Sequence, residues 1–298
     1  MDIVDSQVHL GPGGAAEMVA AMDAIGVRSV LVDEWWGGAL DVPGYRVGEG
    51  GIRTISPTTE LAAWQYPGRF SYLVRVYPDD PEHRTVIRFA RDADHARALR
   101  IAPGISRAEL SRFADGAYDG IFAEASDCGL PVFVTIPGNT VMIERYALKF
   151  PDCRIVICHC GMPPMDGQWR MVAQLEGLPD SETYWRSLAE QPTAQAFNAV
   201  LQAARWPNVA LKWAHAPAYF DAGGYPNAAA RPFLRKALDA FGAERVMWAS
   251  DHTTNQTGET WAELLFAVLA NPELGEDERD RLLGGTAREW LDWPEQAG

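Results

Sequence analysis

The chain has 298 residues, of which 47% are apolar and 22% charged, and its 40 Asp and Glu residues against 26 Lys and Arg give a net charge of −14. This balance excludes a general nucleic-acid binder, because phosphate neutralisation needs a cationic face. It also disfavours binding to anionic lipid. The length suits one large barrel, so residues 1–298 are expected to form a single domain.

The N-terminus, MDIVDSQVHL, carries Asp2 and Asp5 within its first apolar stretch. A signal peptide needs a basic start and an uncharged apolar run, and no window approaches the roughly 18 consecutive apolar residues of a spanning helix. The chain's four cysteines are too few for a disulfide framework. We therefore expect a cytoplasmic protein without a membrane partner.

Short β-rich runs alternate with longer helical patterns along the chain. After the first run, Met18, Met22 and Ile25 recur on one helical face that ends before Gly26. Two stretches, 36–54 and 161–192, are too long for simple connections and predict insertions after the second and sixth strands. The expected strands are residues 3–9, 29–33, 70–77, 98–102, 131–136, 154–159, 208–213 and 245–250.

The apolar runs show little alternation, as in Val132-Phe133-Val134, and such runs are typical of strands buried on both faces of a parallel sheet. Repeated βα units imply a parallel sheet, and eight of them at this length predict a (β/α)8 TIM barrel of the α/β class. An open doubly wound sheet is the competing architecture.

Function in such a barrel collects where the strands end, because the loops that follow form the pocket. Gln7 and His9 lie two apart on the first strand and share a face, and Asp251 ends the eighth strand, which adjoins the first when the barrel closes. An Asp near imidazoles can act as a general base toward water, while His9 and His159 can polarise a carbonyl. The alternative for any single histidine is a hydrogen-bonded core residue. Four of the six histidines fall at strand ends, namely His9, His159, His215 and His252.

Several motifs occur in a fixed order. The first strand reads Asp5-Ser-Gln-Val-His9, which departs from a D-x-H-x-H pattern only at Gln7. Later segments read ICHCGMP at 157–163, NVALK at 208–212, RVMWASD at 245–251 and GGTAR at 284–288. Together they resemble the amidohydrolase superfamily, in its amidohydrolase-related type-2 branch. The resemblance runs from residue 1 to about 291 and implies the same barrel fold.

The resemblance also bears on metal binding. Metal-dependent members hold a divalent ion with the strand-one pair, a strand-five histidine and the strand-eight Asp. Here Gln7 and Thr135 stand at two of those positions, and an amide or a hydroxyl is a poor zinc ligand. Since His9 and Asp251 alone would bind an ion weakly, we expect no tightly held metal and no other cofactor. The alternative is a divalent metal such as zinc at His9 and Asp251.

The retained residues are similar to those of pyrone-dicarboxylate and sugar lactonases, in which the barrel hydrolyses lactones without a metal. This resemblance implies that Asp251 activates water, that His9 and His159 stabilise the oxyanion, and that Gln7 donates a further hydrogen bond. Two alternatives stay open. One is a metal-dependent decarboxylase of an aromatic or unsaturated acid, and the other is a non-catalytic barrel that binds a small acid.

Substrate-binding candidates also lie near the strand ends. Arginine recognises carboxylates in bidentate geometry, so Arg75 and Arg100 are expected to hold an acidic substituent, unless they pair with Asp33 or Glu34. An aromatic-walled pocket with arginines suits a carboxylated cyclic ester as the small-molecule partner. A homo-oligomer is left open. The full set is Trp35, Arg75, Arg100, Lys212, His215 and His252, of which Lys212 and His215 carry the same ambiguity and His252 either lines the pocket or caps its loop.

Overall fold

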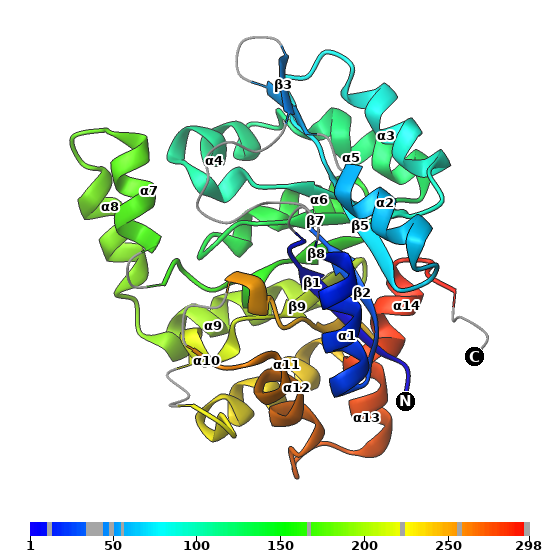
Figure 1. The fold of residues 1–298 in the computed structure, drawn as a ribbon. Helices are drawn as coiled ribbons and strands as arrows, with labels where there is room; N and C mark the ends of the chain where they lie inside the picture. The colour runs from blue at the N-terminus through cyan, green and yellow to red at the C-terminus, as the bar shows by residue number, and fades with distance from the viewer. Residues whose placement is uncertain are drawn as a thin grey trace.

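The apolar runs form one parallel sheet of eight strands whose spatial order follows the chain, β1-β2-β5-β6-β7-β8-β9-β10 (Figure 1). The computed structural model describes residues 1–10, 14–33, 44–47, 51–54, 57–165, 168–220, 224–254 and 258–294. The strands are β1 (Ile3–Val8), β2 (Val27–Val32), β5 (Phe70–Arg75), β6 (Ala96–Ile101), β7 (Val132–Val134), β8 (Ile155–Ile157), β9 (Val209–Trp213) and β10 (Val246–Trp248).

The first and last strands meet through backbone and side-chain contacts. The Asp251 amide donates to the Gln7 carbonyl at 3.0 Å, and the Ser6 hydroxyl donates to the Trp248 carbonyl at 2.7 Å. These contacts bring the end of the eighth barrel strand beside the first. The prediction of a (β/α)8 barrel is therefore confirmed, and the open doubly wound sheet is wrong.

Helices surround the barrel (Figure 1). The first of them buries Met22 and ends at Gly26, whose positive φ of 84° suits a residue without a Cβ. The helices are α1 (Ala15–Ile25), α2 (Pro57–Gln65), α3 (His83–Asp92), α4 (Arg107–Ala114), α5 (Asp119–Cys128), α6 (Ile143–Lys149), α7 (Gln168–Glu176), α8 (Ser181–Ala189), α9 (Thr193–Leu201), α10 (Ala216–Tyr219), α11 (Arg231–Phe241), α12 (Trp261–Leu269), α13 (Glu276–Asp280) and α14 (Thr286–Trp290).

The insertion at 161–192 folds into α7 and α8, which stand out from the barrel (Figure 1). Arg107 on α4 holds this pair through Glu176 at 2.9 Å and Asp180 at 2.7 Å. The insertion at 36–54 contains an antiparallel hairpin, β3 (Gly44–Val47) with β4 (Gly51–Thr54), and its other residues lie outside the described ones. None of the helices in the described ranges has the length and apolar character needed to cross a bilayer.

The barrel interior is apolar away from the site and becomes polar toward the C-terminal ends of the strands. The apolar cluster takes in residues such as Val4, Phe133 and Met247 together with Trp290 of α14. Arg100 and Lys212 each lie two residues beyond a member of this cluster, so alternation along the strands points them into the barrel one layer higher. Cys158, which belongs to the cluster, lies in the same layer two residues beyond Val156. All three are buried. This polar layer lies toward the strand ends that carry the site.

Gly284 lies where the C-terminal segment packs on β1, and a Cβ there would lie 1.9 Å from the backbone oxygen of Asp2. Because backbone cannot yield cheaply, we expect Gly284→Ala to lower the free energy of unfolding by about 2–3 kcal/mol. The matched control is Gly285→Ala, whose nearest neighbour is the flexible Arg281 side chain at 3.3 Å. Denaturant melts of both variants measure the difference, and equal stabilities would contradict it.

Candidate active site

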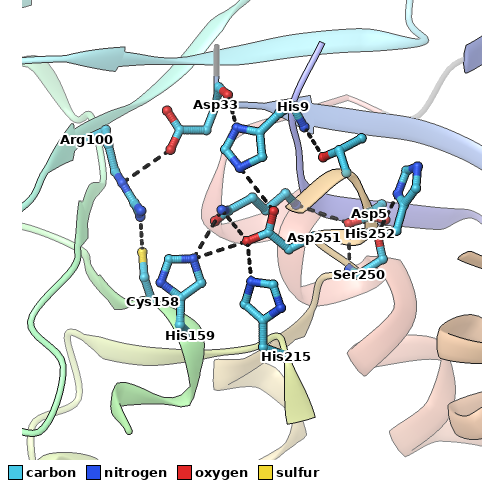
Figure 2. Close-up of polar contacts among 12 residues, drawn as sticks. Asp5, His9, Asp33, Arg100, Cys158, His159, His215, Ser250, Asp251 and His252 are labelled. Atoms are coloured by element: carbon cyan, nitrogen blue, oxygen red, sulfur yellow. Dashed lines mark hydrogen bonds and ion pairs between the residues drawn. The ribbon is translucent and has the colours of Figure 1, made fainter. Parts of the chain in front are cut away.

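Three side chains from different strand ends converge on the carboxylate of Asp251 (Figure 2). His9 follows β1, His159 opens the turn after β8, and His215 precedes α10 after β9. Asp251 itself follows β10 and is 1% exposed. His9, His159 and Asp251 were predicted from the sequence to act together in catalysis. His215 was predicted only as a substrate-binding candidate.

His159, His215 and Asp251 share an unusual backbone conformation, with φ values of 52°, 54° and 49°. A left-handed backbone costs roughly 1–2 kcal/mol for a residue that carries a Cβ, and such strain gathers at functional sites. At each position the chain turns abruptly at the end of a strand. The three side chains are thereby held at the mouth of the barrel rather than following the direction of their strands.

Four nitrogen atoms surround the Asp251 carboxylate. His9 Nε2 lies 3.0 Å from Oδ1, and Gln7 Nε2, His215 Nε2 and His159 Nε2 lie 2.7, 2.9 and 3.3 Å from Oδ2. Burial alone would raise the pKa of Asp251, but the three histidines outweigh it and hold this pKa well below the usual range. Asp251 is therefore ionised at neutral pH.

The tautomer of His9 follows from its second contact. Its Nδ1 lies 2.5 Å from the backbone oxygen of Asp33, and a carbonyl only accepts, so Nδ1 carries the proton. A neutral His9 would then turn the lone pair of Nε2 toward Asp251. Burial lowers the pKa of His9, but the Asp251 and Asp33 contacts outweigh it and the pKa is raised, which favours a proton on both ring nitrogens.

The orientation of the Gln7 amide is set by Asp251. An ionised carboxylate oxygen cannot donate, so the amide atom 2.7 Å from Oδ2 must be the nitrogen. That nitrogen also lies 3.1 Å from His159 Nε2, and its second proton makes this ring nitrogen an acceptor. Burial lowers the pKa of His159 to about 3, which agrees with a neutral ring. Gln7 thus holds both groups by donating to each.

Arg75 and Arg100 both face Asp33. Arg75 Nε and Nη2 lie 2.9 and 2.7 Å from Oδ1, and Arg100 Nε lies 3.4 Å from Oδ2 (Figure 2). Burial would raise the pKa of Asp33, but the two guanidinium groups hold it far below its usual value. The alternative partner Asp33 is therefore the one found in the structure. The second Arg100 contact is a hydrogen bond from Nη1 to the Cys158 thiol.

Lys212 and His252 lie in different surroundings. Lys212 is fully buried, its Nζ has no hydrogen-bond partner among the described residues, and burial lowers its pKa. The His252 ring stacks on Trp261 at 4.2 Å, and its Nδ1 lies 3.2 Å from the Ser250 hydroxyl. His252 is thus tied to its own loop and to α12, which is the second of its two predicted roles. Trp35 lies outside the described residues.

Asp5 is a positioning residue that the sequence argument did not single out. It accepts hydrogen bonds from the backbone amides of Ser250 at 2.9 Å and Gln7 at 3.1 Å, and from Trp261 Nε1 at 2.8 Å. These bonds join the end of β1 to the end of β10 and so set the distance between Gln7 and Asp251. The sequence does contain a clue to this role, because Asp5 lies two residues before Gln7 and therefore on the same face of the strand.

The expectation of no tightly held metal rested on a count of two good ligands, His9 and Asp251. Among the described residues, His159, His215 and Asp251 offer donor atoms that all lie within 4.8 Å of one another. Two imidazoles and a carboxylate are ligands that zinc prefers. The structure thus adds His159 and His215 to the possible ligands, because a histidine beyond the seventh strand turns back to Asp251. The expectation of no tightly held metal stays a prediction.

Solved structures resemble the whole barrel at low sequence identity. An amidohydrolase from Burkholderia multivorans with bound zinc is 16% identical over 99% of this chain and 100% of its own, with a TM-score of 0.70. A Pseudomonas putida protein named for 2-pyrone-4,6-dicarboxylic acid hydrolysis is 17% identical over 99% of both chains, with a TM-score of 0.67. The 5-carboxyvanillate decarboxylase LigW of Sphingomonas paucimobilis is 16% identical over 98% and 99%, with a TM-score of 0.63.

No curated protein matches the chain in sequence. The family model described as Amidohydrolase matches residues 57–293, which is well over half of the chain. The matched segment includes three of the four groups that converge at the barrel mouth, His159, His215 and Asp251. The chain therefore belongs to the amidohydrolase family.

Proposed function

We propose that this amidohydrolase hydrolyses a lactone or a related cyclic ester of a small acidic molecule. The observation that carries the proposal is the buried, ionised Asp251 carboxylate ringed by His9, His159 and His215 at the barrel mouth. A carboxylate in this position can take a proton from water, and imidazoles beside it can stabilise a developing oxyanion. The proposed reaction is compatible with a bound divalent ion, because His159, His215 and Asp251 offer three ligand atoms close together.

In the proposed reaction, water attacks the ester carbonyl while Asp251 accepts one of its protons. The carbonyl becomes a tetrahedral oxyanion, and the positive charge of the protonated His9 ring stabilises it. The two N–H groups of this ring stay on the Asp33 carbonyl and on Asp251, and His159 completes the surroundings of the oxyanion. Collapse of this intermediate breaks the ring C–O bond, and the proton on Asp251 passes to the departing alkoxide. Gln7 fixes the positions of Asp251 and His159 relative to each other by donating a hydrogen bond to each. A divalent ion held by His159, His215 and Asp251 would add Lewis-acid polarisation.

Charge at the site favours an acidic substrate. Arg100 and Lys212 are buried, Arg75 is 17% exposed, and all three act on the charge of Asp33. Together with protonated His9 they make four cationic groups against three buried carboxylates, Asp5, Asp33 and Asp251, which leaves an excess of one positive charge in a chain whose net charge is −14. A substrate carboxylate could neutralise this excess by approaching Arg75, the most accessible of these cationic groups.

Decarboxylation of an aromatic or unsaturated acid is the second candidate, and the three-donor set of His159, His215 and Asp251 is the observation that favours it. There a C–C bond breaks, carbon dioxide leaves and the ring carbon takes a proton. The two reactions differ in their products, so they can be separated without knowing the natural substrate.

The test is a panel of carboxylated lactones followed by proton release, run beside a panel of aromatic acids followed by carbon dioxide release. We expect one proton per lactone opened and no carbon dioxide. Carbon dioxide without proton release from lactones would overturn the proposal in favour of decarboxylation. Ligand-induced stabilisation without either product would indicate a binding protein.

A further inference from the structure

We infer that His159, His215 and Asp251 form a three-ligand site for a divalent cation of the zinc type. In this site His215, from the turn after β9, supplies an imidazole that Gln7 on strand one and Thr135 after strand five do not. The inference goes beyond the proposed hydrolysis, since the site can be measured without any substrate. It also differs from the ligand set that the family resemblance implied, with which it shares only Asp251.

The distances between the donors suit one ion. Zn–N and Zn–O bonds of about 2.0–2.1 Å place neighbouring ligand atoms of a tetrahedral site about 3.4 Å apart. Asp251 Oδ2 lies 3.3 Å from His159 Nε2 and 2.9 Å from His215 Nε2, and the three donors lie within 4.8 Å of one another. Three protein ligands leave a fourth position open, as in catalytic rather than structural zinc sites.

The protonation state of His159 also suits a cation. Its Nε2 lies 3.1 Å from the Gln7 amide nitrogen, which donates to it, so this ring nitrogen carries its single lone pair and no proton. The same lone pair can bind an ion instead, with the Gln7 amide then donating to Asp251 alone. His159 Nε2 and Asp251 Oδ2 lie 3.3 Å apart with no proton between them, so a positive charge between the two would be favourable.

An independent observation comes from the Gln7 side chain. Gln7 is 1% exposed, and its Oε1 is buried with no hydrogen-bond partner among the described residues. A buried acceptor of this kind is costly unless a donor or a cation satisfies it. Thr135 Oγ1, at the strand-five position where the resemblance expects a histidine, is buried and unpartnered as well. Both unsatisfied oxygens belong to positions that would carry metal ligands in the metal-dependent relatives.

His215 is suited to replace such a ligand. Its φ of 54° turns the side chain back from the loop into the barrel mouth, and its ring lies 5.5 Å from that of His159. Its side chain is 8% exposed, so a ligand there would be shielded from bulk water. His9 lies on the other carboxylate oxygen, and its Nδ1–H bond to Asp33 fixes the ring that faces Asp251.

The experiment measures Zn²⁺ and Co²⁺ binding to untagged full-length protein that has first been stripped with a chelator. We expect about one equivalent of either ion, with the intense visible bands of four-coordinate Co²⁺. In His215→Asn the affinity is expected to fall by about 100-fold or more, since losing an outer-shell partner alone costs 10–100-fold. Asn tolerates the left-handed backbone, so the fold should survive.

The matched control is His252→Gln, which removes a nearby histidine whose ring lies on Trp261 and outside the three-donor set. It should bind Zn²⁺ and Co²⁺ as the wild type does. Wild-type protein that binds neither ion overturns the site, and His215→Asn protein with unchanged affinity and Co²⁺ spectrum overturns the role of His215. Because no substrate is added, these metal-binding results can be interpreted even if the protein does not hydrolyse lactones.

Discussion

Asp251→Asn is expected to lower kcat for lactone hydrolysis by about 10³-fold or more, within the range of about 10²–10⁴-fold for loss of a general base. The Asn amide cannot take a proton from water, and its nitrogen would face ring nitrogens that now meet a carboxylate. Because Asn accepts a φ near 49°, the turn after β10 should form as before.

The control for Asp251→Asn is Asp292→Asn. Asp292 has a similar left-handed backbone, with φ of 44°, but its side chain is 74% exposed and pairs with Arg154. Rates of proton release are measured for both variants, with circular dichroism to confirm folding. A folded Asp251→Asn protein that keeps more than a tenth of the wild-type rate would remove Asp251 from the mechanism.

The barrel could be predicted because each strand is a short apolar run bounded by a turn or a helix. The expected strand at 131–136 and the observed Val132–Val134 differ only at the ends, as do 245–250 and Val246–Trp248. Closure of the sheet then brings the ends of the first and last strands together, which is why His9 and Asp251 could be placed side by side from the sequence. His159 could be placed at the same mouth because it ends the predicted sixth strand.

The rest of the site depends on backbone turns and side-chain partners that no periodicity encodes. His215 reaches Asp251 only because its backbone adopts a left-handed conformation, which the sequence Trp-Ala-His-Ala does not announce. Arg75 and Arg100 could have faced substrate or a carboxylate, and the choice of Asp33 follows from the neighbouring positions of β2, β5 and β6 in the sheet. The place of His215 among the possible metal ligands could not be predicted for the same reason.

Asp33→Asn is expected to lower the free energy of unfolding at pH 7 by about 3–5 kcal/mol, the usual cost of breaking a buried ion pair by removing one partner. Asp33 is 1% exposed and is the carboxylate that Arg75 and Arg100 share. Without its charge, two guanidinium groups would stand close together in the barrel. The backbone oxygen that accepts from His9 would be unchanged.

The pH dependence of this effect has a definite sign. The pKa of Asp33 is lowered in the folded protein by Arg75 and Arg100, so its contribution is complete above the unfolded pKa of about 3.9 and is lost as pH falls toward the folded value. The stability gap between wild type and Asp33→Asn should therefore be constant from pH 7 to about 5 and narrow below about 4. Urea melts across this range measure the stability gap.

The surface control is Asp23→Asn, which removes a 63% exposed partner of Arg69 and should change the free energy of unfolding little at any pH. A gap that stays constant down to pH 3, or widens there, would mean that Asp33 is not the anionic centre of this layer.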